Sequence, residues 1–276
     1  MNVFITGASG GLGRAIAAEC AGRGYRLFLT DINETGLFSL RSGLERQYGA
    51  CVVTKACDLT DSADVDKMLG VIDDSGIRFD MLINIAGIDY EGGFLDRERE
   101  SLTQIVELNI EATLRITHAV LSRRTANKPF SLVFVSSLAA MYPMPLKATY
   151  AASKRFLADF AEALRQELKS SNVKVLTLCP GGLPTTQEAI SGIAAQGFWG
   201  SATTNRLETV AYETVEKVQK GKGLYIPGAL NRTLSFFGKL VPRTIVAALI
   251  YRRWHGAQKK WLNTEMDSVL EKPRSA

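Results

Sequence analysis

A chain of 276 residues, 46% apolar and 22% charged, has the composition of an ordinary globular protein. Its net charge of +5 is small and its Lys and Arg residues are dispersed, which excludes the dense basic surface of a nucleic-acid-binding protein. The four cysteines lack metal-binding spacing, so we expect no metal site and a reducing compartment. No secretory leader or run of about 18 apolar residues is visible, and a cytoplasmic protein is expected.

Short apolar, β-branched runs alternate with longer helical patterns along the chain. Strands are predicted at residues 3–6, 26–30, 51–57, 81–85, 131–136, 174–178 and 223–226. Helices are predicted at residues 12–23, 34–48, 62–74, 102–124, 150–170 and 206–220. This alternation predicts a doubly wound, seven-stranded parallel sheet with helices on both faces. We expect one α/β domain over residues 1–276, with a core of 1–227 and a helical extension of 228–276.

A glycine-rich turn directly follows the first predicted strand and opens a helix. Glycines there let the backbone turn sharply and approach a pyrophosphate, which the helix N-terminus stabilises. Such turns also occur without ligands, but this position favours a dinucleotide-binding site. The candidate residues are Gly7, Ser9, Gly10, Gly11, Leu12 and Gly13.

Asp31 ends the second predicted strand and is the main indicator of cofactor preference. A carboxylate there can accept hydrogen bonds from the adenosine ribose and would repel a 2′-phosphate. NAD(H) is therefore favoured, while NADP(H) stays open because Arg14 could reach a phosphate. Asp58 either binds the adenine amino group or caps the helix that begins near Ser62.

Tyr150 and Lys154 are spaced so that both project from one face of a helix. A phenol is a poor acid–base catalyst at neutral pH, but a nearby ammonium favours phenolate and lowers its pKa. The pair, with Ser137 upstream, therefore predicts proton transfer by tyrosine.

These motifs together closely resemble the short-chain dehydrogenase/reductase family, in its compact type. The resemblance spans residues 1–226 and rests on the glycine turn, Asn84-Ile85-Ala86-Gly87, Leu108-Asn109-Ile110, Ser136-Ser137, Tyr150–Lys154 and Pro180-Gly181. The chain departs from the family pattern at Ile85, usually Asn, and at Ala140, where Gly is common. Neither departure removes a reacting group.

The resemblance implies a Rossmann fold and the catalytic residues Asn109, Ser137, Tyr150 and Lys154. Tyr150 would exchange a proton with the substrate oxygen, and Ser137 would hydrogen-bond that oxygen. Lys154 would hold the nicotinamide ribose, and Asn109 would interrupt its helix and position a relay water. Further cofactor contacts are implied for Leu59, Asn84, Ala86, Gly87, Tyr150, Lys154, Pro180 and Gly181.

The substrate pocket is expected to be apolar and aromatic, with few fixed charges. Its candidate walls contain Tyr90, Phe94, Met141, Tyr142, Pro143, Met144, Phe198 and Trp199, of which Phe94 and Met144 join Ser137 and Tyr150 as predicted substrate contacts. Such a lining suits a small-molecule hydrophobic ketone or secondary alcohol. Several of these residues could instead be core or subunit contacts.

The amphipathic, basic tail predicts a lid or subunit contact first, and a helix lying on a membrane surface second. The resemblance implies a homodimer or homotetramer through helices 109–124 and 150–170. The predicted function is an NAD(H)-favouring oxidoreductase of hydrophobic alcohols and ketones. NADPH-dependent 3-oxoacyl thioester reduction is one alternative, and a non-catalytic dinucleotide-binding sensor or scaffold is another.

Overall fold

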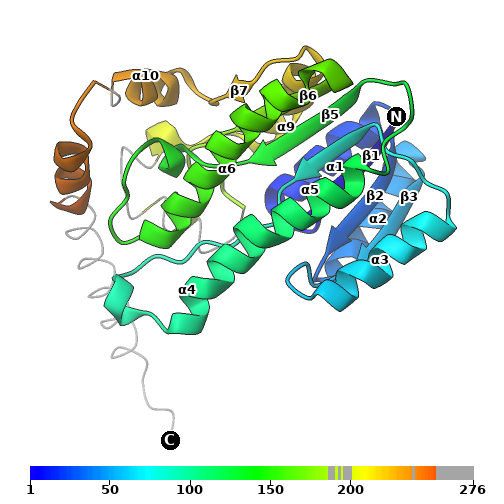
Figure 1. The fold of residues 1–276 in the computed structure, drawn as a ribbon, viewed down its shortest axis with the longest axis horizontal. Helices are drawn as coiled ribbons and strands as arrows, with labels where there is room; N and C mark the ends of the chain where they lie inside the picture. The colour runs from blue at the N-terminus through cyan, green and yellow to red at the C-terminus, as the bar shows by residue number, and fades with distance from the viewer. Residues whose placement is uncertain (186–189, 192–193, 195–200, 238–239, 253–276) are drawn as a thin grey trace, which may run out of the picture.

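The computed structural model describes residues 1–185, 190–191, 194, 201–237 and 240–252. Seven parallel strands form one sheet in the order β3-β2-β1-β4-β5-β6-β7 (Figure 1). The strands are β1 (Asn2–Thr6), β2 (Arg26–Asp31), β3 (Val52–Ala56), β4 (Met81–Asn84), β5 (Phe130–Val135), β6 (Val173–Leu178) and β7 (Leu224–Tyr225). The predicted doubly wound α/β fold is confirmed.

Helices connect the strands and cover both faces of the sheet. They are α1 (Gly11–Gly22), α2 (Glu34–Tyr48), α3 (Ser62–Asp74), α4 (Arg99–Val106), α5 (Thr113–Leu121), α6 (Ala148–Glu167), α9 (Leu207–Gln219) and α10 (Ala229–Phe237). A further helix covers residues 243–252. Local signals set several ends: the Asn33 side chain caps α2, Gly49 ends it with a φ of 60°, and Asp61 caps α3.

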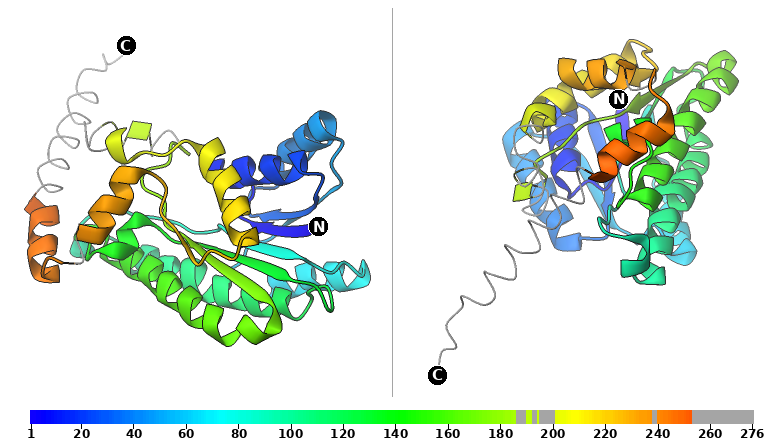
Figure 2. Two further views of the ribbon diagram at one scale, coloured as in Figure 1. Left: turned by 90° about the horizontal axis from the view of Figure 1, so that it is seen from above. Right: turned by 90° about the vertical axis from the view of Figure 1, so that its left-hand side faces the viewer.

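The sheet lies between two helical layers, each with its own apolar core (Figure 2). On one face, α1, α2 and α9 pack on the sheet through residues such as Ile16, Leu37 and Val215. On the other face, α3, α5 and α6 pack through residues such as Ile72 and Leu157. Because both faces are covered, the strands read as nearly continuous apolar runs rather than alternating ones.

The predicted helix of residues 102–124 is divided into three parts. Between α4 and α5 lies a π-helical segment, η2 (Glu107–Ala112), which contains Asn109. The resemblance predicted an interruption at this residue, and the structure has one. Short 3₁₀ segments occur at η1 (Phe94–Asp96), η3 (Leu138–Met141) and η4 (Lys169–Ser171).

The strand order places a crevice at the carboxyl edge of the sheet. From β1 the chain runs outward to β2 and β3, and then returns to β4 on the other side of β1. Such a switch point is where doubly wound sheets bind ligands. The glycine turn follows β1, Asp31 ends β2 and Ser137 closely follows β5, so the candidate residues gather at this edge.

Candidate active site

The glycine turn after β1 is shaped by close backbone contacts. Gly7 has a φ of 63°, and a Cβ added there would lie 2.8 Å from the backbone nitrogen of Ala86. The Thr6 hydroxyl accepts from the backbone N–H groups of Ile85 and Ala86 at 3.0 and 3.2 Å, which joins this turn to the segment after β4. At Gly10, an added Cβ would meet only the Gly7 carbonyl, at 3.5 Å. The turn therefore fits the pyrophosphate of a dinucleotide at the start of α1.

Asp31 lies beside this turn, as the sequence predicted. Its Oδ2 accepts from the Ser9 backbone N–H at 2.9 Å, and its Oδ1 accepts from the Asn33 N–H at 3.0 Å. Arg14 donates to the carbonyls of Ser9 and Gly36 at 2.6 and 3.3 Å. Arg14 is thus held by backbone oxygens, while the carboxylate of Asp31 presents negative charge where an adenosine ribose would lie.

Two predicted cofactor residues have structural partners. The Asp58 carboxylate accepts from the backbone and hydroxyl of Thr60 at 2.9 and 2.7 Å, and Asp61 caps α3 instead. The alternative that Asp58 caps this helix is therefore wrong. The Asn84 side chain donates to the Thr117 hydroxyl of α5 at 3.0 Å, so it anchors α5 to β4. Leu59, next to Asp58, is buried in the core.

Asn109 is fully buried in the π-helical segment and fixes two neighbouring segments. Its Oδ1 accepts from the Ile88 N–H at 2.9 Å, and its Nδ2 donates to the Ile88 carbonyl at 3.0 Å and the Ser153 hydroxyl at 3.0 Å. The widened helical turn directs this side chain toward α6 and the segment after β4. Asn109 thereby lies close to Lys154 and Gly87.

Tyr150, Lys154 and Ser137 converge at the N-terminal part of α6. The Lys154 Nζ lies 5.7 Å from the centroid of the Tyr150 ring, and the Ser137 side chain lies close enough to Tyr150 to influence its pKa. The Lys154 ammonium also donates to the Val135 carbonyl at 3.0 Å. The Ser136 hydroxyl donates to the Lys154 carbonyl at 2.7 Å, which fixes α6 against the end of β5. The structure thus brings together all four residues predicted to be catalytic.

Burial controls the ionisation of this pair. It lowers the pKa of Lys154 to about 8, with the Asp89 carboxylate opposing the shift. Burial also raises the pKa of Tyr150, and Asp89 adds to that effect while the Ser137 hydrogen bond opposes it. The expected lowering of the Tyr150 pKa by Lys154 is therefore not produced by the protein side chains. The cause is that one desolvated environment disfavours both phenolate and ammonium.

Gly87 lies where a side chain would disrupt this constellation. An added Cβ would lie 2.8 Å from Oδ1 of Asn109 and 3.1 Å from Nζ of Lys154. Ala86 is close to Gly7 in the glycine turn. Residues 84–87 therefore connect the predicted dinucleotide site to the proton-transfer groups.

The residues directly after β6 lie beside the segment that contains Ser137. The Pro180 carbonyl accepts from the Leu138 N–H at 2.8 Å, and the Gly181 N–H donates to Oδ1 of Asn205 at 3.1 Å. A Cβ at Gly181 would collide with the Thr203 carbonyl. These contacts hold residues 180–181 next to the serine segment, as expected for a part of the site. The predicted wall residues Phe198 and Trp199 lie outside the described residues.

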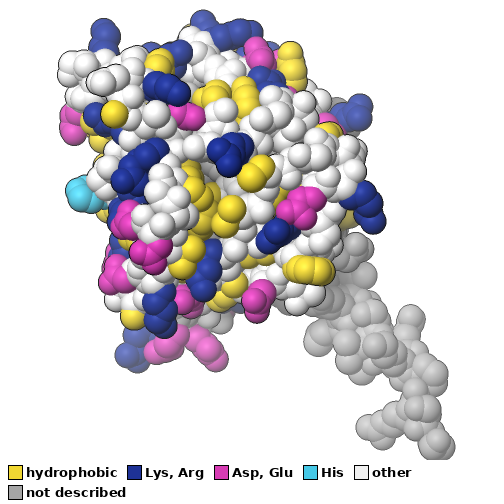
Figure 3. Space-filling model, turned by 90° about the vertical axis from the view of Figure 1, so that its right-hand side faces the viewer, with side chains coloured by type: hydrophobic (Ala, Val, Ile, Leu, Met, Phe, Trp, Pro, Cys, Tyr) yellow, Lys and Arg dark blue, Asp and Glu magenta, His cyan; other side chains and the backbone are white. Residues whose placement is uncertain are grey.

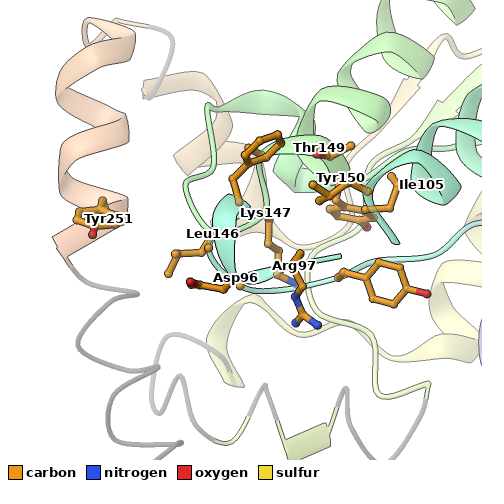
Figure 4. Close-up of a pocket in the computed structure, with 14 residues that line it drawn as sticks. Asp96, Arg97, Ile105, Leu146, Lys147, Thr149, Tyr150 and Tyr251 are labelled. Atoms are coloured by element: carbon orange, nitrogen blue, oxygen red, sulfur yellow. The ribbon is translucent and has the colours of Figure 1, made fainter. Parts of the chain in front are cut away.

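A cavity of about 490 Å³ opens beside Tyr150 (Figure 4). Phe94 lines it, as predicted, but Met144 lines a neighbouring cavity instead. Sequence reasoning missed Lys147, Arg97 and Tyr251, which also line the first cavity. The full lining is Tyr90, Gly92, Gly93, Phe94, Asp96, Arg97, Leu102, Ile105, Leu146, Lys147, Ala148, Thr149, Tyr150 and Tyr251.

The cavity is more charged than the sequence indicated. Lys147 donates to Asp89 at 2.5 Å and approaches Glu91 at 3.4 Å, and its Nζ lies 5.7 Å from the centroid of the Tyr150 ring. Arg97 donates to the Glu91 carbonyl and lies over the Tyr90 ring. The position of Lys147, just before α6 and near Tyr150, is the one local signal that could have identified it.

A model of the short chain dehydrogenase family matches residues 1–191, more than half of the chain. The chain belongs to the short-chain dehydrogenase family. The resemblance seen in the motifs is thereby confirmed, and this member of the family is an oxidoreductase.

Several proteins resemble this short-chain dehydrogenase along much of its length. It is 32% identical over 179 residues to a very-long-chain 3-oxoacyl-CoA reductase of Laccaria bicolor, a match that covers 62% of this chain and 51% of that protein. It is 30% identical over 263 residues to dehydrogenase/reductase SDR family member 7B of Danio rerio, covering 91% and 83%. The match thus spans about half the length of the 3-oxoacyl-CoA reductase.

A solved structure confirms the fold. The short-chain dehydrogenase from Sphingobium yanoikuyae in complex with NADPH superposes with a TM-score of 0.72 at 23% identity, covering 100% of this chain and 96% of that one. At this identity the similarity shows the architecture.

Proposed function

We propose that this short-chain dehydrogenase interconverts a hydrophobic ketone and a secondary alcohol with NAD(H). The observation that carries the proposal is the convergence of Ser137, Tyr150, Lys154 and Asn109 beside a cavity that Tyr150 itself lines. A partly buried phenol that lines a cavity beside a serine side chain suits proton exchange with a carbonyl oxygen.

Each residue has a distinct task in this proposal. The Tyr150 hydroxyl donates a proton to the carbonyl oxygen in reduction and accepts it in oxidation. Ser137 stabilises the charge that develops on that oxygen. Lys154 and Asn109 both lie next to Gly87. There they can hold the ribose of the nicotinamide and pass protons from solvent. A bound nicotinamide supplies the hydride chemistry, and its oxidised form adds positive charge that favours phenolate.

The preference for NAD(H) rests on Asp31. Its carboxylate is fixed by two backbone N–H groups, and Arg14 is engaged with backbone carbonyls. This arrangement favours ribose hydroxyls over a 2′-phosphate. The NADPH bound to the Sphingobium relative makes NADP(H) the alternative.

A second candidate is reduction of long-chain 3-oxoacyl thioesters. It is favoured by the 3-oxoacyl-CoA reductases among the relatives and by the cations Lys147 and Arg97 in the cavity lining. These side chains could contact an anionic carrier group while an acyl chain occupies the apolar part. A sensor or scaffold without turnover is the remaining candidate, and nothing in such a role requires a buried Tyr150–Lys154 pair.

One experiment separates these candidates. The protein is titrated with NADH and NADPH, and then assayed at the nicotinamide absorbance against medium- and long-chain ketones, secondary alcohols and 3-oxoacyl thioesters. We expect tighter NADH binding and turnover of hydrophobic ketones or alcohols. Turnover of thioesters alone would establish the second candidate. Tight dinucleotide binding with no turnover of any class would establish the sensor.

We also propose a homo-oligomer that forms through α5 and α6. Phe156 on α6 is 38% exposed and stacks on Phe160 at 5.9 Å between ring centroids, which presents an aromatic surface. Light scattering after size-exclusion chromatography gives the mass in solution. A monomeric mass at assay concentration would contradict this part of the proposal.

A further inference from the structure

Helix α10 exposes two phenylalanines, while the two residues that it buries most fully are polar. Its inward residues are polar, since Asn231 is 1% exposed and Ser235 is 3% exposed. Its outward residues include Phe236 and Phe237, which are 64% and 59% exposed. A surface helix ordinarily buries its apolar side, so these phenylalanines require another explanation.

Polar contacts fix the orientation of α10. Nδ2 of Asn231 donates to the carbonyls of Thr203 and Pro227 at 3.1 and 2.9 Å. The Tyr142 hydroxyl donates to the Leu234 carbonyl at 2.5 Å. Turning the phenylalanines inward would break these bonds and leave buried polar groups unpaired.

The apolar surface continues along the chain beyond α10. Leu240, Ile245 and Leu249 are 71%, 49% and 60% exposed, and the last two lie on the helix of residues 243–252. Figure 1 shows both helices at the end of the molecule opposite α3. We name Phe236, Phe237, Leu240, Ile245 and Leu249 the C-terminal apolar surface. Within the described residues, no helix is long and apolar enough to cross a membrane.

Basic residues border this surface, and acidic residues are missing from the sequence around it. Arg232, Arg243 and Arg252 are exposed there. Between Glu216 and Glu265 the sequence contains no Asp or Glu, although the chain has 28 in total. Figure 3, which views the molecule from the α2–α3 side, shows acidic and basic side chains interspersed instead.

We propose that the C-terminal apolar surface docks on an anionic membrane surface, with its phenylalanines and leucines at the headgroup boundary. Apolar side chains on a segment whose charged residues are all basic match a surface of anionic lipid. A second copy of the same segment would bring like charges together, because residues 217–264 contain no Asp or Glu side chain. This charge pattern therefore favours lipid over self-association.

Docking would orient the cavity toward the lipid. Tyr251 follows Leu249 on the same helix and lines the cavity that contains Tyr150 (Figure 4). A hydrophobic substrate dissolved in the membrane would thus meet a cavity wall built by the docking helix. The binding itself does not depend on the proposed reaction, and it is measured without turnover.

Vesicle flotation of the full chain tests the proposal. Phosphatidylcholine vesicles with and without phosphatidylglycerol are compared at low and high salt. We expect the protein to float with the anionic vesicles, and less at high salt. The double variant F236S/F237S should bind roughly a hundredfold more weakly, because the loss of each phenylalanine lowers membrane partition roughly tenfold. The control F38S removes an equally exposed phenylalanine, on α2, and should float like wild type.

A charge variant keeps the test decisive if the serine variant misfolds. R243Q/R252Q leaves the apolar side chains in place and should lower binding to anionic vesicles roughly twentyfold. Circular dichroism and NADH binding report whether each variant is folded. No flotation of wild type with anionic vesicles would overturn the proposal. A dimer in sedimentation that F236S/F237S converts to monomer would assign the surface to a second copy, and would also overturn it.

Discussion

The catalytic centre and α10 both bury polar side chains, but they bury different kinds. In the centre, the charged Lys154 is 5% exposed beside Tyr150, and burial shifts the pKa of both groups. In α10, the buried groups are the neutral Asn231 and Ser235. Burying a titratable group costs stability and changes proton affinity, whereas a neutral amide with partners attaches a helix. In this molecule the buried charged side chain therefore lies at the candidate catalytic centre, and the buried neutral polar side chains attach a helix.

Replacing Tyr150 with Phe is expected to have the largest effect, a loss of turnover. The variant lacks the hydroxyl that we propose exchanges the proton, so kcat should fall by roughly a thousandfold or more. NADH affinity should stay close to that of wild type, since the ring is retained. Steady-state assays and a fluorescence titration check both results. Turnover within tenfold of wild type would refute the assigned role.

The pH dependence of stability distinguishes the buried charged group, Lys154, from the buried neutral groups of α10. The Lys154 pKa is about 8 in the folded protein and 10.5 in its ordinary state, so the unfolded chain binds more protons between these values. Burying the protonated Lys154 lowers the free energy of unfolding by about 3 kcal/mol. This cost is present in full below about pH 8 and disappears as the pH rises toward 10.5. The raised pKa of Tyr150 acts with the opposite sign, but only above its ordinary value of 10.

The measurement is the free energy of unfolding by urea for wild type and Lys154→Met. Between about pH 7.5 and about pH 9.5, wild type should gain about 2 kcal/mol relative to the variant. Asn231→Ala serves as the matched control, because it removes a buried neutral group and should lower stability equally at both pH values. Parallel pH profiles for wild type and Lys154→Met would contradict the burial of a charged amine.

A smaller effect is expected at Asp31, which is charged but lies outside the buried centre. Asp31→Ala removes the carboxylate that opposes a 2′-phosphate, so the ratio of NADPH to NADH affinity should rise roughly thirtyfold. Isothermal titration with both dinucleotides measures the ratio. Asp31→Glu retains the charge and serves as the control. A wild type that already binds NADPH more tightly would show that Asp31 does not set the preference.

The smallest effect is expected at the attachment of α10. Tyr142→Phe removes the hydrogen bond to the Leu234 carbonyl and should cost about 1 kcal/mol of stability. The lost hydrogen bond joins Tyr142 to Leu234, and neither is a predicted cofactor contact, so NADH affinity should not change. Thermal unfolding and limited proteolysis near residue 238 follow the loosening. An NADH affinity lowered as much as stability would show that α10 also supports the cofactor site.

Most of the fold was accessible from the sequence because its signals are local. Buried parallel strands read as apolar runs, and caps such as Asn33 and Asp61 mark where helices begin. The division of the predicted helix 102–124 at Asn109 was not accessible in this way. No local pattern distinguishes a π-helical segment from the α-helix that the periodicity predicts, and only the resemblance indicated an interruption there.

The sequence predicted the parts of the candidate site whose residues lie on one helix or strand. It predicted less well the parts that form where segments distant in the sequence meet. Tyr150 and Lys154 are one helical turn apart, whereas Tyr251 reaches the same cavity through the path of the C-terminal chain. Met144, predicted to contact the substrate, lines the neighbouring cavity rather than the one that Tyr150 lines. The chain turns at Leu146, whose φ is 67° and whose carbonyl accepts from the Gly92 N–H, and this tertiary contact is not encoded locally. The pKa of Tyr150 depends on burial, which spacing does not reveal.

The contacts around Gly87 bear on the order in which parts of the site form during synthesis. Gly87 contacts Asn109 and Lys154, which follow it far along the chain, while the segment it ends is already tied to the glycine turn through Thr6. Contacts between distant residues close late because the intervening loop must first be ordered. A nascent chain that has emerged from the ribosome only as far as β4 contains the glycine turn and Asp31, whereas Asn109, Ser137, Tyr150 and Lys154 have yet to be made. The residues proposed to hold the pyrophosphate and the adenosine ribose are therefore made before those proposed to move the proton.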